Sequence, residues 1–367
     1  MKIAQIAPLY ESVPPRNYGG TERVVSYLTE ELVSQGHEVT LFASGDSITG
    51  ARLVPCCASS LRTDSQCIDP LAHHITMLDK VFEAASDFDV VHFHIDYLHF
   101  PYSKWMRLPS ITTLHGRLDI PDLAPLYKSY AEMPVISISD SQREPIPWAN
   151  WQGTIHHGLP PDLFAFHPGP GGYLAFLGRI SPEKRVDRAI RIADRLGMPL
   201  KIAAKIDNAD RDYYESIKGM FQNPYVEYIG EIGGREKEEF LGNAQALLFP
   251  IDWPEPFGLA MIEAMACGTP VVAYRRASVP EVIRDGVSGF IVNDIDAAVV
   301  AVEKTSSLDR LACRREFEKR FTAPRMARDY LATYSRLLSV EYEPGLTVAA
   351  RSAGSVSQGV KAVGSMQ

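Results

Sequence analysis

Short apolar runs alternate with amphipathic stretches along almost the whole chain. In the first half, runs typical of buried strands fall at 2–8, 37–43, 89–94, 110–116, 134–139 and 153–158. Between the first two, residues 21–36 have apolar side chains at helical spacing and end in Gly36, a common residue after the last helical turn. Continuous apolar strands separated by helices predict a parallel sheet that helices cover on both faces.

The pattern restarts after a segment rich in proline and glycine at 160–172, a composition typical of linkers. Predicted strands follow at 173–178, 199–205, 226–230, 246–250, 270–274 and 289–292, and predicted helices at 183–196, 211–220, 235–243 and 258–266. The chain is therefore expected to form two doubly wound α/β domains. Parallel sheets of this kind bind ligands at the carboxyl ends of their strands, so we expect the site in the cleft between the domains.

These patterns divide the chain into five segments. We predict an N-terminal domain over 1–163, a linker over 164–172 and a C-terminal domain over 173–323. A terminal helix over 324–340 has apolar side chains at helical spacing, and we expect it to pack back toward the N-terminal domain. Residues 341–367 are rich in small residues and have no persistent apolar face, which predicts a flexible tail.

The composition is that of a globular protein without a membrane span. Of 367 residues, 46% are hydrophobic and 22% are charged, as in ordinary soluble domains. No apolar run approaches the roughly 18 residues of a membrane helix, and the first residues resemble a buried strand more than a signal peptide. The five cysteines show no metal spacing, which favours reduced thiols and a cytoplasmic protein.

The formal net charge of −8 arises mostly within residues 1–150. Nucleic-acid-binding proteins carry a basic footprint, so the charge excludes nucleic acid as a partner. Small anionic molecules remain compatible ligands, because a few local cations are enough to bind them. The sequence leaves the oligomeric state open.

Two glutamates bracket the apolar helix predicted at 258–266. A carboxylate in a buried helix needs hydrogen-bond donors, and Glu263 would find them in the two adjacent hydroxyls of a ribose. Glu255 precedes the helix in a proline-flanked loop, beside helix N–H groups that favour anions. The alternative is that Glu255 is an exposed loop acid and that Glu263 points to solvent.

Other candidate residues also lie at predicted strand ends. Arg179 and Lys184 follow the strand at 173–178 and suit a diphosphate, although ordinary surface charge gives the same pattern. Gly19 and Gly20 precede the first helix, where backbone N–H groups can approach a phosphate or sugar, or where the chain simply turns.

Histidines cluster near strand ends in the N-terminal half. His115 ends a predicted strand and is a candidate partner for a sugar hydroxyl or an acid/base group. We interpret His92, His94, His156 and His157 as structural. The spacing of His92 and His94 invites a metal hypothesis, which we reject because no acidic or Cys/His cluster completes a site.

Taken together, four segments resemble the retaining glycosyltransferases of family 4, which have the GT-B fold. EPFGLAMIEAMACGTPVVA with VPEVIRDGVSGFIV resembles the family's glutamate–seven–glutamate signature and its downstream region, and GRISPEKRVDRAI resembles its Gly-Arg…Lys segment. YGGTERVVSYLTEELVSQGHEVTLFA resembles its glycine loop and first helix, and TLHG its histidine-containing strand end. The resemblance runs from residue 1 to about 340 and implies two Rossmann-like doubly wound domains facing a central cleft.

The resemblance also implies roles for individual residues. Glu263 would bind the ribose of a nucleotide-sugar, Glu255 and His115 would lie at the donor sugar, and Arg179 and Lys184 would hold the diphosphate. These last four are the catalytic candidates. The whole donor site would comprise Gly19, Gly20, Arg179, Lys184, Lys205, Glu231, Ile232, Glu255, Phe257, Gly258, Leu259 and Glu263.

The sequence departs from the family pattern at two places. Many members have a Gly-x-Gly turn after the second strand of the C-terminal domain, where this chain has Lys205, a third cation for the diphosphate or a surface residue. The Gly-Gly pair usual before Pro280-Glu281 is replaced by residues 276–279, which puts donor contacts carried over to this loop in doubt.

The reaction implied is transfer of a sugar, with retention, from a nucleotide-diphosphate sugar to a hydroxyl of a glycan, lipid or small molecule. A UDP- or GDP-sugar is the expected donor, with a UDP-glucose-like one preferred, and no metal or other cofactor is expected. Acceptor contacts are expected on loops at 44–75 and 96–108. A GT-B nucleotide-sugar epimerase and a non-catalytic sugar-nucleotide-binding protein are the alternatives.

Overall fold

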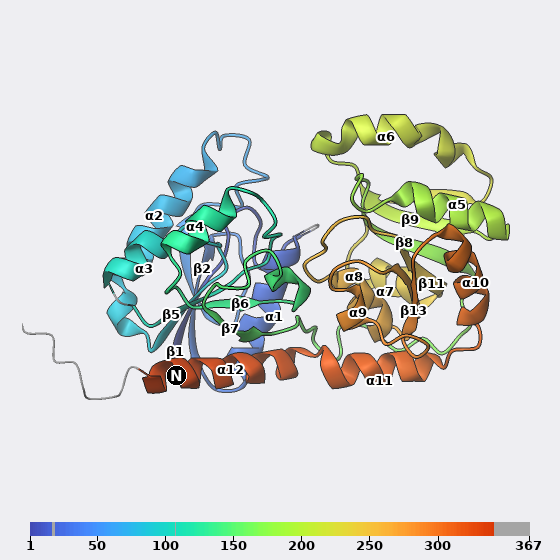
Figure 1. Cartoon of the computed structure of the whole chain (residues 1–367). Coiled ribbons are helices and arrows are strands. Elements are labelled where there is room, and N and C mark those ends of the chain that lie inside the picture. The colour runs from blue at the N-terminus through green and yellow to red at the C-terminus, as the bar shows by residue number, and fades with distance from the viewer. Residues whose placement is uncertain (17–18, 107, 341–367) are drawn as a thin grey trace, which may run out of the picture.

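The computed structural model describes residues 1–16, 19–106 and 108–340. Figure 1 shows two α/β domains beside each other, with the last two helices running beneath them. Two sequence expectations fall outside the described residues: the flexible tail at 341–367, and the part of the glycine loop at Tyr18.

The N-terminal domain is built on a seven-stranded sheet in the order β3-β2-β1-β4-β5-β6-β7, with every neighbouring pair parallel. Its strands are β1 (Lys2–Ile6), β2 (Glu38–Ser44), β3 (Arg52–Cys57), β4 (Val90–Phe93), β5 (Ser110–Thr113), β6 (Val135–Ser137) and β7 (Trp151–Thr154). Its helices are α1 (Gly20–Ser34), α2 (Pro70–Glu83), α3 (Phe100–Met106) and α4 (Leu123–Ser129).

The C-terminal domain is built on a six-stranded parallel sheet in the order β10-β9-β8-β11-β12-β13. Its strands are β8 (Tyr173–Arg179), β9 (Leu200–Lys205), β10 (Val226–Gly230), β11 (Ala244–Phe249), β12 (Val271–Tyr274) and β13 (Gly289–Val292). Its helices are α5 (Val186–Leu196), α6 (Arg211–Ile217), α7 (Gly234–Gly242), α8 (Leu259–Ala266), α9 (Val279–Val282), α10 (Ile295–Thr305) and α11 (Arg310–Arg320).

Successive positions in these strands are apolar because other elements cover both faces of each sheet. In β8, Leu174 and Ala175 are fully buried but belong to two different hydrophobic clusters, and Leu247 and Leu248 of β11 are divided in the same way. Successive strand side chains point to opposite faces, so both faces demand apolar residues. In each sheet the strands are added first on one side of the first strand and then on the other. The order therefore reverses between β1 and β4 and between β8 and β11. Folds of this kind bind ligands at such switch points.

The terminal helix α12 (Ala323–Val340) lies beneath the N-terminal domain (Figure 1). Its Met326, Tyr330 and Tyr334 are buried in the cluster that contains residues of α1 and β1. The chain returns from the C-terminal to the N-terminal domain beside Leu159, whose N–H donates to the carbonyl of Phe321 at 2.9 Å. At this crossing a Cβ on Gly158 would lie 2.3 Å from the carbonyl oxygen of Thr322, so only glycine fits.

Several elements differ from the sequence prediction. The segments 44–75 and 96–108, predicted as loops, contain β3, the start of α2 and all of α3. The edge strand β3 was missed because it has a proline and alternates only weakly between buried and exposed positions. The strand predicted at 153–158 is Trp151–Thr154, because residues 155–158 leave the sheet to reach the crossing at Gly158.

We expect Met326→Ala to lower the free energy of unfolding by about 2–5 kcal/mol, because it leaves a cavity where α12 meets the N-terminal domain. Denaturant-induced unfolding measures the change. The matched control is Arg328→Ala, an exposed position on the same helix, which should change the free energy by no more than about 0.5 kcal/mol. Equal effects of the two substitutions would show that this side of α12 is not a stabilising contact.

Candidate active site

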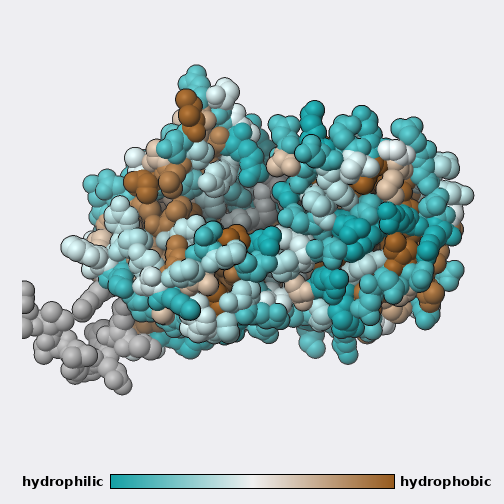
Figure 2. All heavy atoms as spheres, turned by 45° about the horizontal axis from the view of Figure 1, so that its top comes forward, coloured by the Kyte–Doolittle hydropathy of each residue, from teal (hydrophilic) through white to brown (hydrophobic). Residues whose placement is uncertain are grey.

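A cavity of about 720 Å³ lies between the two domains, and residues of both domains line it. Figure 2 shows the recess between the two halves of the molecule. The cavity is lined by residues just after β1, β4 and β5 on one side and by the last residues of β8 and β11 on the other. The cleft predicted from the strand pattern is therefore present, at the carboxyl ends of the strands.

The N-terminus of α8 opens directly into this cavity. Gly258, the residue before the helix, has φ +86°, and a Cβ there would lie 2.7 Å from the side chain of Met261 and 3.0 Å from the ring of Phe249. No side chain caps the helix. The first N–H groups of a helix have no partner within it and carry its positive end, so the cavity wall at 257–259 favours an anion.

Lys184 and Glu255 form an ion pair at the cavity wall. Trp253 completes the group, because its Nε1–H donates to Glu255 Oε2 at 2.8 Å and its ring lies 5.0 Å from Lys184 Nζ. The backbone and side chain of Glu255 are only 8% exposed, so it is not an exposed loop acid. Lys184 thus brings a partly buried ammonium, paired with Glu255, to the wall of the cavity that also contains the start of α8.

Glu263 lies one turn inside α8 and is 3% exposed. Its Oε1 accepts a hydrogen bond from Lys237 Nζ of α7 at 2.9 Å, and both residues line the cavity. The alternative that Glu263 points to solvent is therefore wrong. Lys237 was not predicted as a site residue, because the sequence carries no signal for a contact between residues so far apart.

Arg179, at the end of β8, lines the cavity between two acids. Its Nη2 donates to Glu183 Oε2 at 2.9 Å, and its Nε lies 3.0 Å from Asp210 Oδ2. Glu231 and Ile232, after β10, also line the cavity.

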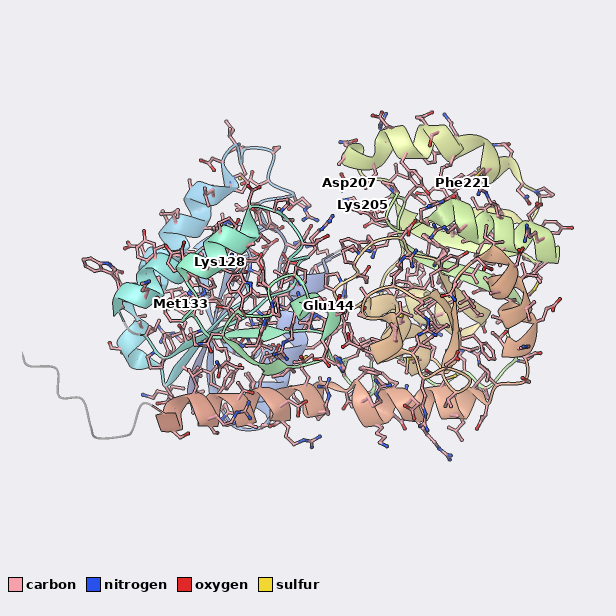
Figure 3. The ribbon with its side chains drawn as sticks, viewed as in Figure 1. Lys128, Met133, Glu144, Lys205, Asp207 and Phe221 are labelled. Atoms are coloured by element: carbon pink, nitrogen blue, oxygen red, sulfur yellow. The ribbon has the colours of Figure 1, made fainter. Side chains whose placement is uncertain are left out.

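Lys205 is the one predicted donor-site residue that is not part of the cavity lining. Its Nζ lies 3.4 Å from Asp207 Oδ2, and Figure 3 shows both residues at the edge of the C-terminal domain that faces the N-terminal domain. Lys205 is also the register partner of Arg179 on the neighbouring strand, and its role as a third cation at the diphosphate stays a prediction.

Gly19 and Gly20 line the opposite wall of the cavity, where Gly20 begins α1. A Cβ on Gly20 would lie 3.8 Å from the side chain of Leu259, so the two helix starts face each other across the cleft. The backbone here approaches the anion-favouring wall from the other domain.

His115 also lines the cavity, and its Nε2 lies 2.9 Å from His94 Nδ1. Its ring stacks on His157, with 5.4 Å between ring centroids. Burial lowers the pKa of His115 to about 3, so the ring is neutral at physiological pH. His94 and His157 line the cavity as well, whereas His92 lies behind them and bonds to Thr113 and Tyr334.

Two family models match this chain. The model described as Glycosyl transferases group 1 matches residues 166–320, and the model described as Glycosyltransferase Family 4 matches residues 18–150. Each model thus matches one of the two domains that face the cavity.

The chain is a member of glycosyltransferase family 4.

One curated relative of this glycosyltransferase is the phosphatidyl-myo-inositol mannosyltransferase of Mycobacterium tuberculosis, which is 25% identical over 93% of this chain and 96% of that protein. Among solved structures, AviGT4, a glycosyltransferase involved in avilamycin A biosynthesis, is 24% identical with a TM-score of 0.72 over 92% of this chain and 98% of its own. Anabaena HepE in complex with UDP and glucose is 18% identical, with a TM-score of 0.71 over 92% and 100%. The predicted GT-B fold is confirmed.

The glycosyltransferase also has site residues that the sequence did not suggest. Asp96, which follows β4 and lines the cavity, has φ +52°, a strained conformation that is common at functional sites. Burial raises its pKa to about 6, against a hydrogen bond from the backbone of His115. The residue lies two positions after His94 at a strand end, so the pattern that selected the histidines could have found it.

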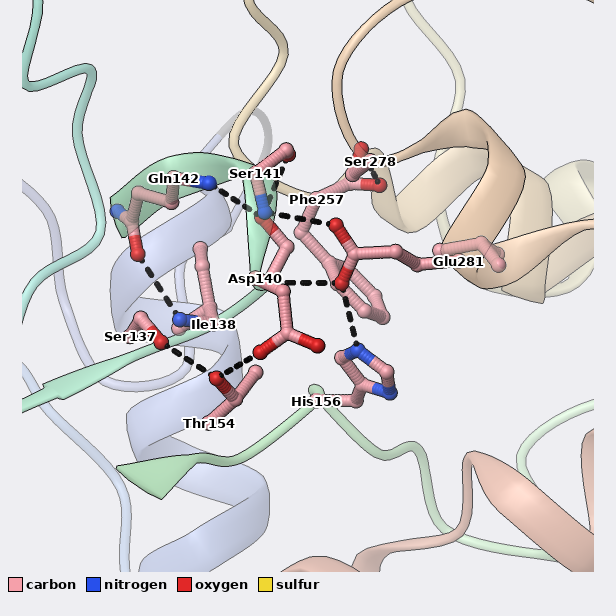
Figure 4. Close-up of polar contacts among 12 residues, drawn as sticks. Ser137, Ile138, Asp140, Ser141, Gln142, Thr154, His156, Phe257, Ser278 and Glu281 are labelled. Atoms are coloured by element: carbon pink, nitrogen blue, oxygen red, sulfur yellow. Dashed lines mark hydrogen bonds and ion pairs between the residues drawn. The ribbon is translucent and has the colours of Figure 1, made fainter. Parts of the chain in front are cut away.

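A hydrogen-bonded junction joins the two domains of the glycosyltransferase beside the cavity (Figure 4). Glu281 of α9 accepts the backbone N–H of Asp140 at 2.7 Å and that of Ser141 at 2.8 Å, and it lies 3.3 Å from His156 Nε2. Ser278, also near the start of α9, donates its hydroxyl to the carbonyl of Phe257 at 2.9 Å. The junction therefore bonds the N-terminal domain to the same segment that supports the start of α8.

Among the residues that the structure describes, no three His, Cys, Asp or Glu side chains are grouped so that they could hold a metal ion. Within the same residues, no helix has the length and apolar character needed to cross a bilayer.

We expect Glu281→Gln to lower the free energy of unfolding at neutral pH by about 1.5–3 kcal/mol. The two backbone N–H groups bond to different carboxylate oxygens, and glutamine has an NH2 donor in place of one of them. Burial alone would raise the pKa of Glu281, but the hydrogen bonds from His156, Asp140 and Ser141 hold it below its ordinary value of 4.5. The carboxylate thus stabilises the fold above that pH.

The free energies of unfolding of the unsubstituted protein and of Glu281→Gln should therefore approach each other as the pH falls through the lowered pKa of Glu281. Denaturant unfolding at pH values on both sides of 4.5 measures them. Glu303→Gln, at an exposed position of α10, is the control and should show no such pH-dependent difference. A constant difference across the range would mean that the ionised junction does not stabilise the fold.

Proposed function

We propose that this chain transfers a sugar, with retention and without a metal ion, from a nucleotide-diphosphate sugar to a hydroxyl acceptor. The observation that carries the proposal is the start of α8. Its open N-terminus, with Lys184 beside it, suits a diphosphate, while Glu263 one turn further into the helix suits the ribose.

The nucleotide would lie along the C-terminal domain. Glu263 would accept hydrogen bonds from the ribose hydroxyls, in place of or beside the bond from Lys237. The backbone at Glu231 and Ile232, which also lines the cavity, would lie near the base. HepE, whose structure was solved with UDP and glucose, supports a UDP-sugar, and a UDP-glucose-like donor is our preferred candidate over a GDP-sugar.

The proposed chemistry depends on stabilising the leaving diphosphate. Negative charge grows on it as the bond to the anomeric carbon breaks, and Arg179, Lys184 and the positive end of α8 are already fixed around that position. Glu255 would hold the Lys184 ammonium and lie beside the sugar. The diphosphate itself would take the proton of the acceptor hydroxyl, so no covalent enzyme nucleophile is required.

The acceptor would enter from the N-terminal domain. Tyr10 and Leu71 lie on this side of the cavity, and both side chains are about half exposed (42% and 51%). Such walls suit the apolar face of a glycan or the aglycone of a lipid or small molecule. Closure of the domains would bring Gly19 and Gly20 onto the donor and exclude water.

We expect Lys184→Ala to reduce kcat/KM for the transferred donor by at least about a hundredfold, because a preorganised charge at the transition state contributes roughly 3–4 kcal/mol. The donor is first chosen by thermal-shift screening with UDP, GDP, ADP and their sugars, since a ligand at about a hundred times its Kd stabilises by ~2.7 kcal/mol. Transfer or donor hydrolysis then gives the kinetics.

The matched control is Lys218→Ala, an exposed lysine at the start of a turn after α6 whose partner is Glu215. Its kcat/KM should equal that of the unsubstituted enzyme. A loss of less than about tenfold in Lys184→Ala would contradict the proposed role of this ammonium at the diphosphate.

We expect transfer and donor hydrolysis to persist in the presence of EDTA. Arg179, Lys184 and the positive end of α8 would stabilise the negative charge of the diphosphate, as a divalent cation does in metal-dependent transferases. The assay compares rates with EDTA, with EDTA followed by excess Mn²⁺, and with no addition. Abolition by EDTA together with rescue by Mn²⁺ would rule out the metal-independent mechanism.

A further inference from the structure

A chain of buried hydrogen bonds connects the terminal helix to the cavity. It begins at Tyr334 of α12, passes through Gln5 of β1 and His94 after β4, and ends at His115. The first three residues are buried, and His115 lines the cavity. Each link joins segments that are far apart in the sequence, so only the folded chain forms it.

With the Gln5 amide oriented so that its Nε2 faces Tyr334, the chemistry of the groups decides which atom donates at each link. The amide oxygen Oε1 of Gln5 can only accept, so the His94 Nε2 at 2.8 Å must carry the hydrogen. Burial lowers the pKa of His94 well below its usual range, so its ring is neutral and its other nitrogen, Nδ1, can only accept. His115 Nε2, 2.9 Å from that nitrogen, must therefore be the donor.

It follows that the neutral ring of His115 has its hydrogen on Nε2 and a lone pair on Nδ1. This Nδ1 is buried and has no partner among the residues that the structure describes. Buried polar atoms are nearly always paired in proteins, and an unpaired one beside a cavity indicates a ligand group. The matching group is a hydroxyl, which a sugar supplies.

The orientation of the Gln5 amide agrees with its contact to α12. Its Nε2 donates to Tyr334 Oη at 3.3 Å. The Tyr334 hydroxyl then has one hydrogen left, and His92 Nδ1 lies 2.7 Å away as its acceptor. If Gln5 rotated its amide by half a turn, an N–H would face the N–H of His94, and every link as far as His115 would have to reverse.

We propose that Gln5 and Tyr334 are positioning residues that fix the tautomer of His115, so that its Nδ1 accepts a hydrogen bond from a hydroxyl of the donor sugar. The assignment of the sugar rests on the proposed function. The assignment of the tautomer rests on hydrogen bonds within the chain and on the neutral state of the two buried histidines.

The tautomer is tested in the full-length protein without substrate, by measuring the imidazole nitrogen chemical shifts of His115 by NMR. Loss of the signal in His115→Gln gives its assignment. We expect a protonated Nε2, an unprotonated Nδ1 and no titration near neutral pH. A hydrogen on Nδ1 would overturn the proposal, and this outcome needs no other variant to be folded.

The variants are Tyr334→Phe and, as a matched control, Tyr330→Phe. Both remove one buried hydroxyl from the same helix. The Tyr330 hydroxyl bonds to Thr113 at 2.9 Å and reaches Tyr334 only through Thr113 and His92, whereas the Tyr334 hydroxyl bonds to Gln5 directly. Only Tyr334→Phe should produce the second tautomer of His115. Identical His115 spectra in the two variants would overturn the positioning role.

Kinetics with the chosen donor then test the sugar contact. Tyr334→Phe should lower kcat/KM by about tenfold, the effect of losing one hydrogen bond, while the Kd of the free nucleoside diphosphate stays unchanged. An equal loss in Tyr330→Phe, or weaker binding of the nucleotide itself, would count as a structural effect and overturn the sugar contact. Absence of any activity with the predicted tautomer present would instead overturn the proposed function alone.

Discussion

The open N-terminus of α8 is the feature on which the rest of the site depends. A carboxylate, two cations and two glycine-containing loops line the same cavity as this uncapped helix start. Gly258 makes this start possible, because any side chain there would collide with Phe249 and Met261. The positive end of a helix is a fixed charge that needs no reorganisation, which is the property that an enzyme handling a leaving anion requires.

The site also depends on how the two domains are bonded together. Glu281 reaches across the cleft to two backbone N–H groups of the N-terminal domain, and its neighbour Ser278 holds the carbonyl of Phe257. α12 crosses in the other direction and packs Tyr330 and Tyr334 against the buried His92. Contacts from segments far apart in the sequence thus support the walls of the cavity, so the cleft geometry is a property of the whole chain.

The sequence predicted most strands closely, including the edge strands β10 and β13, and it missed β3. β1, β4 and β8 are continuous apolar runs and were predicted within two residues or so. β3 escaped because an edge strand is covered less and tolerates proline. In the site, Glu263 and Lys184 were found from local pattern, whereas Lys237 and Glu281's junction were not, because their partners are distant in sequence.

By itself, the sequence determined the fold class and the family, because both follow from local pattern: the spacing of apolar residues and short motifs at strand ends. Tertiary structure alone decided which groups meet. In the folded chain Lys184 forms an ion pair with Glu255, Lys205 lies outside the cavity lining, and the buried His94 forms a hydrogen bond with Gln5. Hydrogen bonds and ion pairs act over a few ångströms in space, and no regularity of the one-dimensional chain records those distances.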